Sequence, residues 1–409
     1  MTGHRAATAP GRRPWLALGA TLSVQAASTL ALTCLSVMAP AVAPLLGMPP
    51  QRVGWLVGIA YATAMVSGLL AGTWAARIGA IRLSRMAVLL SAAGLLLASA
   101  AGLPGWVLVL PAAALLLGLA YGLPNPTASL VLARHAPPHR RGLFFSIKQT
   151  GVPIGVGLAA LLVPPLLDAM PWPAALAVLA ALCGALALGL RAARVLDVPD
   201  PAAGAAPREA PAAAPLLAPL LKVWRTPAVR RLGVASLVYS MTQLSYITFL
   251  VSYLALEHGR GLAAAAGVLA ASQVLSVVSR VAWGQLADRW GQPARLLGLL
   301  GLAMGLAIGL LGALPPGLPT LTAAVALLCA ATAMAWNGVF YAELAVQVRP
   351  EDMAEATGGT QVLTFAGAMI GPVAFAVLVG PLGGHGAAFM GLAVLPVAVG
   401  VWMLVRARG

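Results

Sequence analysis

The feature that most constrains the fold of this chain is a series of apolar stretches, each long enough to cross a lipid bilayer. A membrane-spanning helix needs about 20 predominantly apolar residues. Stretches of this kind, bounded by Pro, Gly or charged residues, cover residues 15–38, 53–76, 83–103, 106–133, 143–167, 172–191, 228–255, 262–287, 295–314, 319–346, 354–380 and 386–406. We therefore predict an all-α membrane protein with twelve transmembrane helices.

The composition supports a lipid rather than an aqueous environment. Only 9% of the residues are charged and 60% are hydrophobic, whereas a soluble domain carries about 25% charged residues. A closed β-barrel is the other structure that can span a membrane, but its strands alternate polar and apolar side chains. The run LLSAAGLLLASAAGL at 89–103 does not alternate, so helices are predicted.

The net charge of +15 would suggest a nucleic-acid partner, but the positions of the basic residues argue against one. Arg52 and Arg260 fall in loops predicted to face outward, and Lys148 and Arg280 fall within spans. All other Lys and Arg residues lie at the opposite ends of the spans, in the loops there or in the tails. This bias marks the cytoplasmic side, so we predict a multi-pass inner-membrane protein with both termini in the cytoplasm.

The segment 192–227 separates two groups of six spans. Its sequence PDPAAGAAPREAPAAAP at 199–215 is rich in Pro and Ala, which is typical of a flexible linker. The predicted organisation is a cytoplasmic tail at 1–14, a six-helix bundle at 15–191, a cytoplasmic linker at 192–227, a second bundle at 228–406 and a tail at 407–409. The first apolar run is too long for the core of a signal peptide, so we interpret it as a retained span.

The two halves resemble each other in sequence. The segment GTWAARIG at 72–79 closes the second span, and GQLADRWG at 284–291 closes the eighth, 212 positions later. Asn125 and Asn337 share that offset. Glycines at the fifth span match glycines at the eleventh with an offset of 216: Gly142, Gly151 and Gly155 match Gly358, Gly367 and Gly371.

Twelve spans, a central linker and the loop G-x-L-A-D-R-x-G resemble the major facilitator superfamily. The loop pattern of that family is roughly G-x-x-x-D-R-x-G-R-R. The second copy here matches at Gly284, Asp288, Arg289 and Gly291, whereas the first copy has Ala76 in place of the acid and keeps Gly72, Arg77 and Gly79. The resemblance implies two pseudo-symmetric six-helix bundles, transport by alternating access, and a gate formed by charged residues at this loop. The gate residues so implied are Arg77, Asp288 and Arg289. Glu343 lies near the cytoplasmic end of the tenth span, where it is expected to join this gate as a partner of Arg289 or Arg295.

Charged residues inside spans are costly and mark functional positions. Lys148 would either extend back to the headgroups or, beside Gln149, line a polar cavity. Arg280 lies about 12 Å deeper than Asp288 along its helix; it would either pair with Glu343 or line the same cavity. Glu343 would either join the gate or carry a proton, because a desolvated carboxyl has a raised pKa.

Polar residues near the middle of the spans form pairs four residues apart, which places each pair on one helix face. The family resemblance implies that spans 1, 4, 7 and 10 line the transport cavity. Hydrogen bonds between helices are the alternative role for any one of these residues. The predicted cavity residues, besides Lys148, Gln149 and Arg280, are Gln25, Tyr121, Asn125, Tyr239, Gln243, Gln273, Asn337 and Tyr341.

Nothing in the sequence indicates an enzyme or a metal site. There is no phosphate-binding G-x-x-x-x-G-K-[ST] loop. The five histidines are scattered over tails and loops, and the three cysteines lie in separate apolar runs with no spacing that suits zinc or a disulfide. We expect no cofactor and no metal.

We therefore predict a secondary transporter that works as a monomer. Lys148 and Arg280 give the predicted cavity two positive charges, and Glu343 offsets at most one of them. This balance favours a small organic or inorganic anion as the substrate, with protons as a candidate coupling ion. Efflux of lipophilic drugs or amphiphiles is the first alternative, and it is distinguished by whether both cations face one cavity. A non-transporting receptor or sensor is the second alternative.

Overall fold

The computed structural model describes residues 13–197, 223–349 and 352–406. Most of the predicted linker, at 198–222, and the greater part of both predicted tails lie outside this range. Within it, twelve helical segments are long and apolar enough to cross a membrane, which confirms the predicted helical membrane fold.

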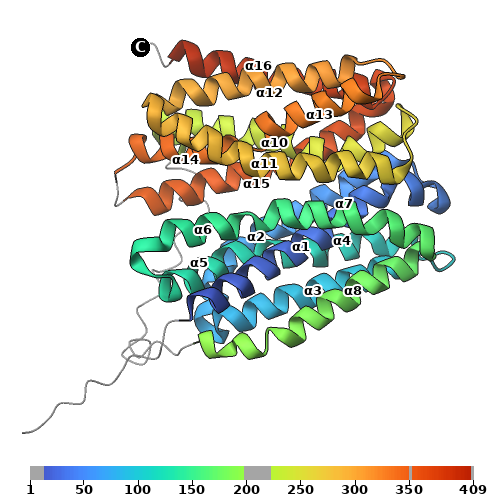
Figure 1. The fold of residues 1–409 in the computed structure, drawn as a ribbon, viewed down its shortest axis with the longest axis horizontal. Coiled ribbons are helices and arrows are strands. Elements are labelled where there is room, and N and C mark those ends of the chain that lie inside the picture. Colours follow the sequence, from blue (N-terminus) through green and yellow to red (C-terminus); the bar gives the residue numbers. More distant parts are fainter. Residues whose placement is uncertain (1–12, 198–222, 350–351, 407–409) are drawn as a thin grey trace, which may run out of the picture.

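The helices form two bundles that lie side by side (Figure 1). The first bundle contains α1 (Pro14–Val42), α2 (Val53–Ile78), α3 (Ala80–Ala100), α4 (Leu110–Gly122), α5 (Pro124–His135), α6 (Arg141–Gln149), α7 (Gly151–Ala169) and α8 (Trp172–Gly189). The second contains α10 (Pro227–Leu256), α11 (Leu262–Trp290), α12 (Pro293–Ala313), α13 (Pro319–Ala333), α14 (Trp336–Gln347), α15 (Met353–Leu382) and α16 (His385–Arg406). Short 3-10 helices cover Pro44–Leu46, Pro50–Arg52, Val107–Val109, Pro138–Arg140 and Ala192–Leu196.

Many large apolar side chains lie on the outside of the molecule. Leu108 is 87% exposed, and Leu306 and Val274 are each 68% exposed. A water-facing surface seldom carries so many exposed large apolar residues, whereas a surface that faces lipid tails is built from them. In contrast, α1 and α10 are largely buried, which places them at the centre of their bundles.

Three of the twelve spans are interrupted, and two of these interruptions are related by the internal repeat. The span Val107–His135 breaks at Leu123 between α4 and α5, and the span Pro319–Gln347 breaks at Met334 and Ala335 between α13 and α14. Each break comes just before an asparagine of the matched pair, Asn125 or Asn337. At the first break Pro124 has no N–H to donate to the preceding turn. The third break, at Thr150 between α6 and α7, lies near Pro153.

The matched glycines hold equivalent helix pairs together. A Cβ atom on Gly155 of α7 would lie 2.4 Å from the carbonyl oxygen of Ala26 in α1. A Cβ atom on Gly371 of α15, 216 positions later, would lie 2.5 Å from the carbonyl oxygen of Met241 in α10. Only glycine permits such close backbone contact. The repeat seen in the sequence thus corresponds to the same helix packing in both bundles.

The bundles pack closely at the end of the molecule farthest from Pro14 and Arg406, the first and last residues of the described helices, and we call it the far end. The opposite end, where Pro14 and Arg406 lie, is called the termini end. At the far end α2 contacts α15, α1 contacts α10 and α7 contacts α11. A Cβ atom on Gly54 would lie 2.3 Å from the carbonyl oxygen of Pro372, and one on Gly58 would lie 2.4 Å from Val373. The far end is therefore closed in this conformation.

The loop between α2 and α3 is held by an acid from elsewhere in the chain. The carboxylate of Asp197, just after the 3-10 helix Ala192–Leu196, accepts hydrogen bonds from the backbone N–H groups of Ile81 at 2.8 Å and Arg82 at 3.1 Å. These are N–H groups of the first turn of α3, which have no partner within the helix. Asp197 thus caps α3 beside the loop copy in which Ala76 replaces the acid of the family pattern.

Candidate functional site

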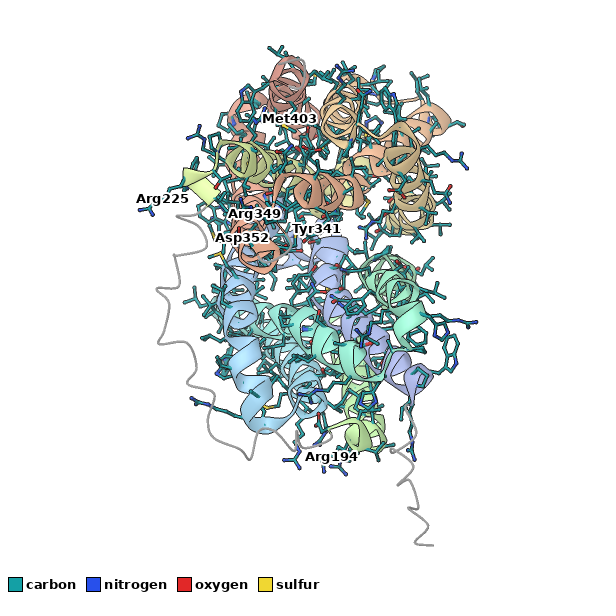
Figure 2. All side chains as sticks on the ribbon, turned by 90° about the vertical axis from the view of Figure 1, so that its left-hand side faces the viewer. Arg194, Arg225, Tyr341, Arg349, Asp352 and Met403 are labelled. Atoms are coloured by element: carbon teal, nitrogen blue, oxygen red, sulfur yellow. The ribbon has the colours of Figure 1, made fainter. Side chains whose placement is uncertain are left out.

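A cavity of about 520 Å³ lies between the two bundles, nearer to the end that carries the chain termini. Figure 2 looks at the molecule from that end and shows Tyr341 between the bundles. Tyr341 is 37% exposed. The lining comes from α2, α4, α5, α6 and α7 on one side and from α10, α11, α14 and α15 on the other. The cavity is therefore shared by both bundles and opens toward the termini.

The helix breaks supply part of the cavity's hydrogen-bonding groups. The carbonyl oxygen of Met334, freed where α13 ends, accepts a hydrogen bond from Nε of Arg280 at 2.8 Å. The carbonyl oxygen of Ala331, one turn earlier, accepts a hydrogen bond from Nε1 of Trp283 at 2.9 Å. A broken helix near the midplane leaves backbone groups that side chains or ligands can bind. The break between α13 and α14 thus fixes the position of Arg280.

Arg280 is the only charged side chain among the described residues that line the cavity. Its Nε atom is held by Met334, and its two Nη atoms have no hydrogen-bond partner in the described part of the chain. A guanidinium group presents paired N–H donors that match a carboxylate or another oxyanion in two places. The cavity therefore offers a fixed cationic group with unused donors.

Lys148 lies within the first bundle, behind the cavity wall. Its ammonium group donates hydrogen bonds to Oε1 of Gln25 at 3.1 Å and to Oδ1 of Asn125. The side chain is 3% exposed, so it does not extend to the headgroups. Asn125 itself lines the cavity. Lys148 thus affects the cavity through Asn125 rather than by direct contact, and only one of the two predicted cations faces the cavity.

Several other predicted cavity residues do line it, namely Tyr121, Asn125, Gln149, Gln243, Asn337 and Tyr341. The structure places three predicted residues elsewhere. Gln25 is fully buried against Lys148 and Thr29. The hydroxyl of Tyr239 donates to the carbonyl oxygen of Leu297 in α12 at 3.0 Å. Gln273 donates to Ser272 of its own helix at 3.2 Å and to Sδ of Met334, at the end of α13, at 3.8 Å. These three residues pack between helices, which is the alternative role considered above.

Sequence reasoning missed three aromatic side chains of the cavity lining: Tyr61, Trp336 and Phe365. Tyr61 of α2 lies edge-to-face with Tyr121 of α4, with ring centroids 5.3 Å apart, and 6.1 Å from the ring of Phe365 in α15. Trp336 also lines the cavity and donates to Oε1 of Gln243 at 2.9 Å. Isolated aromatic residues in apolar spans carry no sequence signal, so only their meeting in space identifies them.

Glu343 lies in a different pocket from Arg280. This second pocket, of about 500 Å³, is at the termini end of the second bundle and is also lined by Arg231 and Arg295. Glu343 is 4% exposed, and its Oε1 atom accepts a hydrogen bond from Gln347 at 2.6 Å. The ion pair between Glu343 and Arg280, one of the two roles expected for Arg280, is therefore absent among the described residues, because Glu343 on α14 and Arg280 on α11 face separate pockets.

The other predicted gate residues, Arg77, Asp288 and Arg289, are exposed at the termini end. None of them makes a hydrogen bond or ion pair within the described part of the chain. A gate at this end would close only when the bundles approach each other there. In the present conformation these residues are exposed, and the bundles are in contact at the far end.

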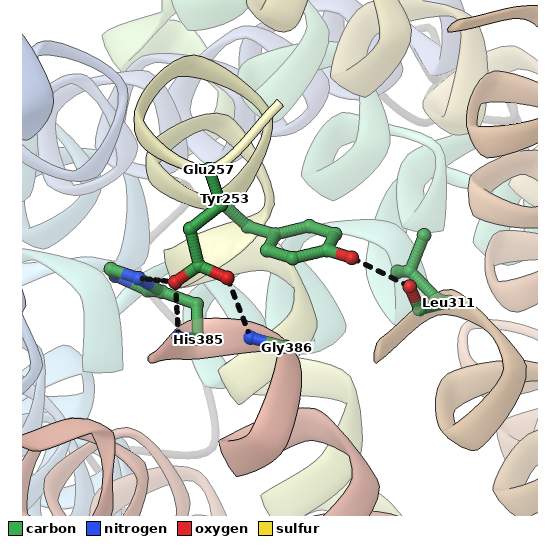
Figure 3. A network of polar contacts seen from close by, with 5 residues as sticks. All are labelled: Tyr253, Glu257, Leu311, His385 and Gly386. Carbon is green, nitrogen blue, oxygen red and sulfur yellow. Dashed lines mark hydrogen bonds and ion pairs between the residues drawn. The ribbon is translucent and has the colours of Figure 1, made fainter. Parts of the chain in front are cut away.

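The far end contains a polar network between α10 and α16 (Figure 3). One oxygen of Glu257 accepts hydrogen bonds from the backbone N–H of His385 and from its Nδ1 atom, the latter at 2.8 Å. The other accepts from the N–H of Gly386 at 3.0 Å. Burial of Glu257 would raise its pKa, but these hydrogen bonds outweigh burial and hold the pKa below its ordinary value. Glu257 thus caps α16 as a carboxylate.

The described residues include no group of three or more His, Cys, Asp or Glu side chains that could hold a metal ion. Cys34, Cys183 and Cys329 are each buried and unpaired. They pack as small apolar side chains within their spans.

Comparison with protein families gives one match across most of the chain. The family model described as Major Facilitator Superfamily matches residues 21–372. Two curated proteins of Mycobacterium tuberculosis, from the strains CDC 1551 and H37Rv, are each described as an uncharacterized MFS-type transporter. Each is 29% identical to this chain over 182 residues, which is 43% of this chain and 38% of the relative. The chain is thus matched to less than half the length of these curated relatives.

Solved structures share the fold over nearly the whole chain. A bacterial homolog of the human lysosomal transporter Spinster, in an inward-facing and occupied conformation, has a TM-score of 0.71 and 17% identity, covering 98% of this chain and 96% of that chain. A peptide transporter POT in complex with sulfate has a TM-score of 0.75 and 18% identity, covering 96% and 94%. At these identities the likeness concerns the fold alone.

Proposed function

Because the chain belongs to the Major Facilitator Superfamily, and is therefore a multi-pass membrane transporter, we propose that it moves a small organic or inorganic anion by alternating access. The observation that carries this proposal is the charge of the cavity. Its described lining contains Arg280 and no acidic residue, and Asn125 in that lining accepts a hydrogen bond from Lys148.

An unpaired charge in a largely desolvated cavity is costly, and a bound counterion offsets that cost. The same charge repels cations, because a cationic ligand would have no acidic partner in the lining. An anion therefore fits the cavity better than a cation. The position of the cavity between two repeat-related bundles places it where the bundles can expose it to either side in turn.

The closed far end and the open termini end describe one state of this cycle. We propose that the termini end is cytoplasmic, because it carries most of the arginines, so that this state faces inward in the inner membrane. Reporter fusions in the segment between the bundles and at Gly409 would both signal cytoplasm; a periplasmic signal from either would contradict the orientation. We also propose that the chain has no catalytic activity and acts as a monomer.

Proton coupling remains part of the proposal and has one candidate carrier. The cavity lining includes no carboxyl group among the described residues, so a proton would have to be carried by Glu343 in the neighbouring pocket. Uptake driven by an imposed pH gradient in proteoliposomes, and lost in Glu343→Gln, would support this role. Uptake that ignores the gradient would exclude it.

Export of lipophilic compounds is the second candidate function, because five aromatic side chains line the same cavity: Tyr61, Tyr121, Trp336, Tyr341 and Phe365. The deciding experiment is counterflow in proteoliposomes with a panel of labelled small anions, neutral lipophiles and cations. We expect exchange of anions by the native protein, and loss of that exchange in Arg280→Gln.

Arg230→Gln is the matched control, because Arg230 is exposed on α10 and outside the cavity lining. If Arg280→Gln remains monodisperse and exchanges anions normally, the anion proposal is wrong. If neutral lipophiles exchange instead, the second candidate function replaces it.

A further inference from the structure

The aromatic side chains at the cavity are arranged as a surface that joins the two bundles. Tyr61 and Tyr121 come from the first bundle, and Phe365 comes from the second. Their ring separations, 5.3 Å for the tyrosine pair and 6.1 Å for Tyr61 and Phe365, are in the range of favourable aromatic contacts. We call Tyr61, Tyr121 and Phe365 the aromatic wall. It lies where the cavity meets a smaller chamber of about 60 Å³ that Tyr61 and Tyr121 also line.

Two further aromatic side chains, Trp336 and Tyr341, are held in place by amides of the second bundle. Trp336 donates to Gln243 at 2.9 Å, and the hydroxyl of Tyr341 donates to Oε1 of Gln361 at 3.1 Å. Because Nε1 of Trp336 and the hydroxyl of Tyr341 already make hydrogen bonds, the two side chains offer mainly apolar ring surface to the cavity. A ligand pays less entropy to bind groups that are already fixed.

The cationic group and the aromatic wall lie on the same cavity. Arg280 and Tyr121 both contribute to the lining of this cavity. The Nε atom of Arg280 is engaged by Met334, which leaves the two Nη atoms for a ligand. A carboxylate bound there would carry its attached group beside the rings.

Resting on the proposed function, we propose that the transported anion is an aromatic carboxylate, with its carboxylate on Arg280 and its ring against the aromatic wall. A cavity of about 520 Å³ is in the range that holds organic ligands. An inorganic oxyanion would leave most of this volume, and all of the aromatic surface, to water. The amides of Gln149 and Asn337 also line the cavity and have no hydrogen-bond partner in the described part of the chain, so they can bind polar ring substituents.

The test is direct binding to purified protein in lipid nanodiscs, with labelled benzoate as the probe. Acetate, cyclohexanecarboxylate, benzyl alcohol and benzylamine serve as competitors. Burial of a ring against the wall should make benzoate bind at least about tenfold more tightly than acetate. Edge-to-face contacts should also favour benzoate over cyclohexanecarboxylate by about two- to tenfold. Benzyl alcohol and benzylamine should compete poorly, because neither carries a negative charge.

Variants of the cavity residues distinguish the contribution of the ligand's ring to binding from that of its carboxylate. Phe365→Leu and Tyr61→Leu should reduce benzoate binding by a larger factor than acetate binding, whereas Phe365→Tyr should preserve the preference for benzoate. Arg280→Gln should weaken both ligands. Phe145→Leu is the control, because Phe145 is partly buried in α6 and outside the cavity lining. Phe365→Tyr also keeps the test informative if the leucine variants do not fold.

Any other result would contradict either the aromatic inference or the anion proposal. Equal affinity for benzoate and acetate, with both dependent on Arg280, would refute the aromatic inference and leave the anion proposal intact. Cyclohexanecarboxylate binding as tightly as benzoate would refute the aromatic requirement. Benzyl alcohol or benzylamine binding as tightly as benzoate, unaffected by Arg280→Gln, would refute both proposals. Failure of benzoate to bind at millimolar concentration would refute the inference, and failure of acetate as well would count against the proposed function.

Discussion

The Nε atom of Arg280 in α11 donates a hydrogen bond to the carbonyl oxygen of Met334 at 2.8 Å, across the break between α13 and α14. The break frees this oxygen from helical hydrogen bonding, and the hydrogen bond orients the guanidinium group. A cation in the cavity is thus positioned by an interruption of a neighbouring span.

Arg280→Lys should reduce anion transport by about tenfold or more, although the charge is kept. A lysine ammonium cannot both occupy the carbonyl oxygen of Met334 and present two parallel N–H donors to an anion. The measurement is initial uptake into proteoliposomes, with Arg230→Lys as the exposed control. Equal rates for Arg280→Lys and the native protein would show that charge alone suffices.

Lys148→Met should destabilise the protein by about 1–3 kcal/mol, because Gln25 and Asn125 would each lose a buried hydrogen-bond donor. Lys148→Arg should also destabilise it, since the site is 3% exposed and a larger group overpacks it. The measurement is thermal unfolding of the purified protein, with Arg140→Met, at an exposed position, as the control. A harmless Lys148→Arg would instead support a side chain that reaches the membrane surface.

Asp288→Asn should shift the population toward the conformation described here. Asp288 has no partner among the described residues in this state, so we expect removal of its charge to cost little here, whereas the family resemblance implies that it bridges helices when the termini end closes. Single cysteines placed near Gly54, at the far end, should then become less accessible to a polar thiol reagent. Asp168→Asn, at an exposed position, is the control, and unchanged labelling in Asp288→Asn would exclude the gate role.

The Glu257 cap should make stability depend on pH. The pKa of folded Glu257 is lower than its ordinary value, so the folded state favours the carboxylate. This contribution is fully present above the ordinary pKa of about 4.3 and is lost as the pH falls through the lower pKa of the folded state. Glu257→Gln should lower the unfolding temperature at pH 7, and the difference from the native protein should shrink as the pH falls below about 4. A difference independent of pH would contradict this account.

Gly155→Ala should destabilise the protein by about 1–3 kcal/mol, because the new methyl group would lie 2.4 Å from the carbonyl oxygen of Ala26. Gly157→Ala is the matched control two residues later. There the nearest atom to a new Cβ would be the Cβ of Gln273, at 3.8 Å. Gly157→Ala should be neutral or slightly stabilising, since alanine favours a helix. Thermal unfolding of the two variants compares them, and equal effects would show that the close contact of α7 with α1 is unimportant.

The number and positions of the membrane spans could be predicted from the sequence because they depend on properties of each stretch by itself. The length and hydropathy of a stretch determine whether it can cross a bilayer, so the twelve spans were predicted without any knowledge of their packing. The repeat offsets of 212 and 216 predicted equivalent positions, and the structure shows the same helix breaks and glycine contacts there. Arg280 and Lys148 were recognisable because charge inside a span is rare.

The direction of each side chain was decided only by the tertiary structure. Arg280 faces the cavity, Lys148 lies behind Asn125, and Glu343 enters a separate pocket. The three side chains lie on different helices, which turn them in different directions and bring them beside different hydrogen-bond partners. Hydropathy contains no information on either. The wall formed by Tyr61, Tyr121 and Phe365 likewise arises only where two bundles meet. Sequence by itself determined which segments enter the membrane, because insertion depends on solvation; the tertiary structure decided what they enclose, because that depends on packing between distant segments.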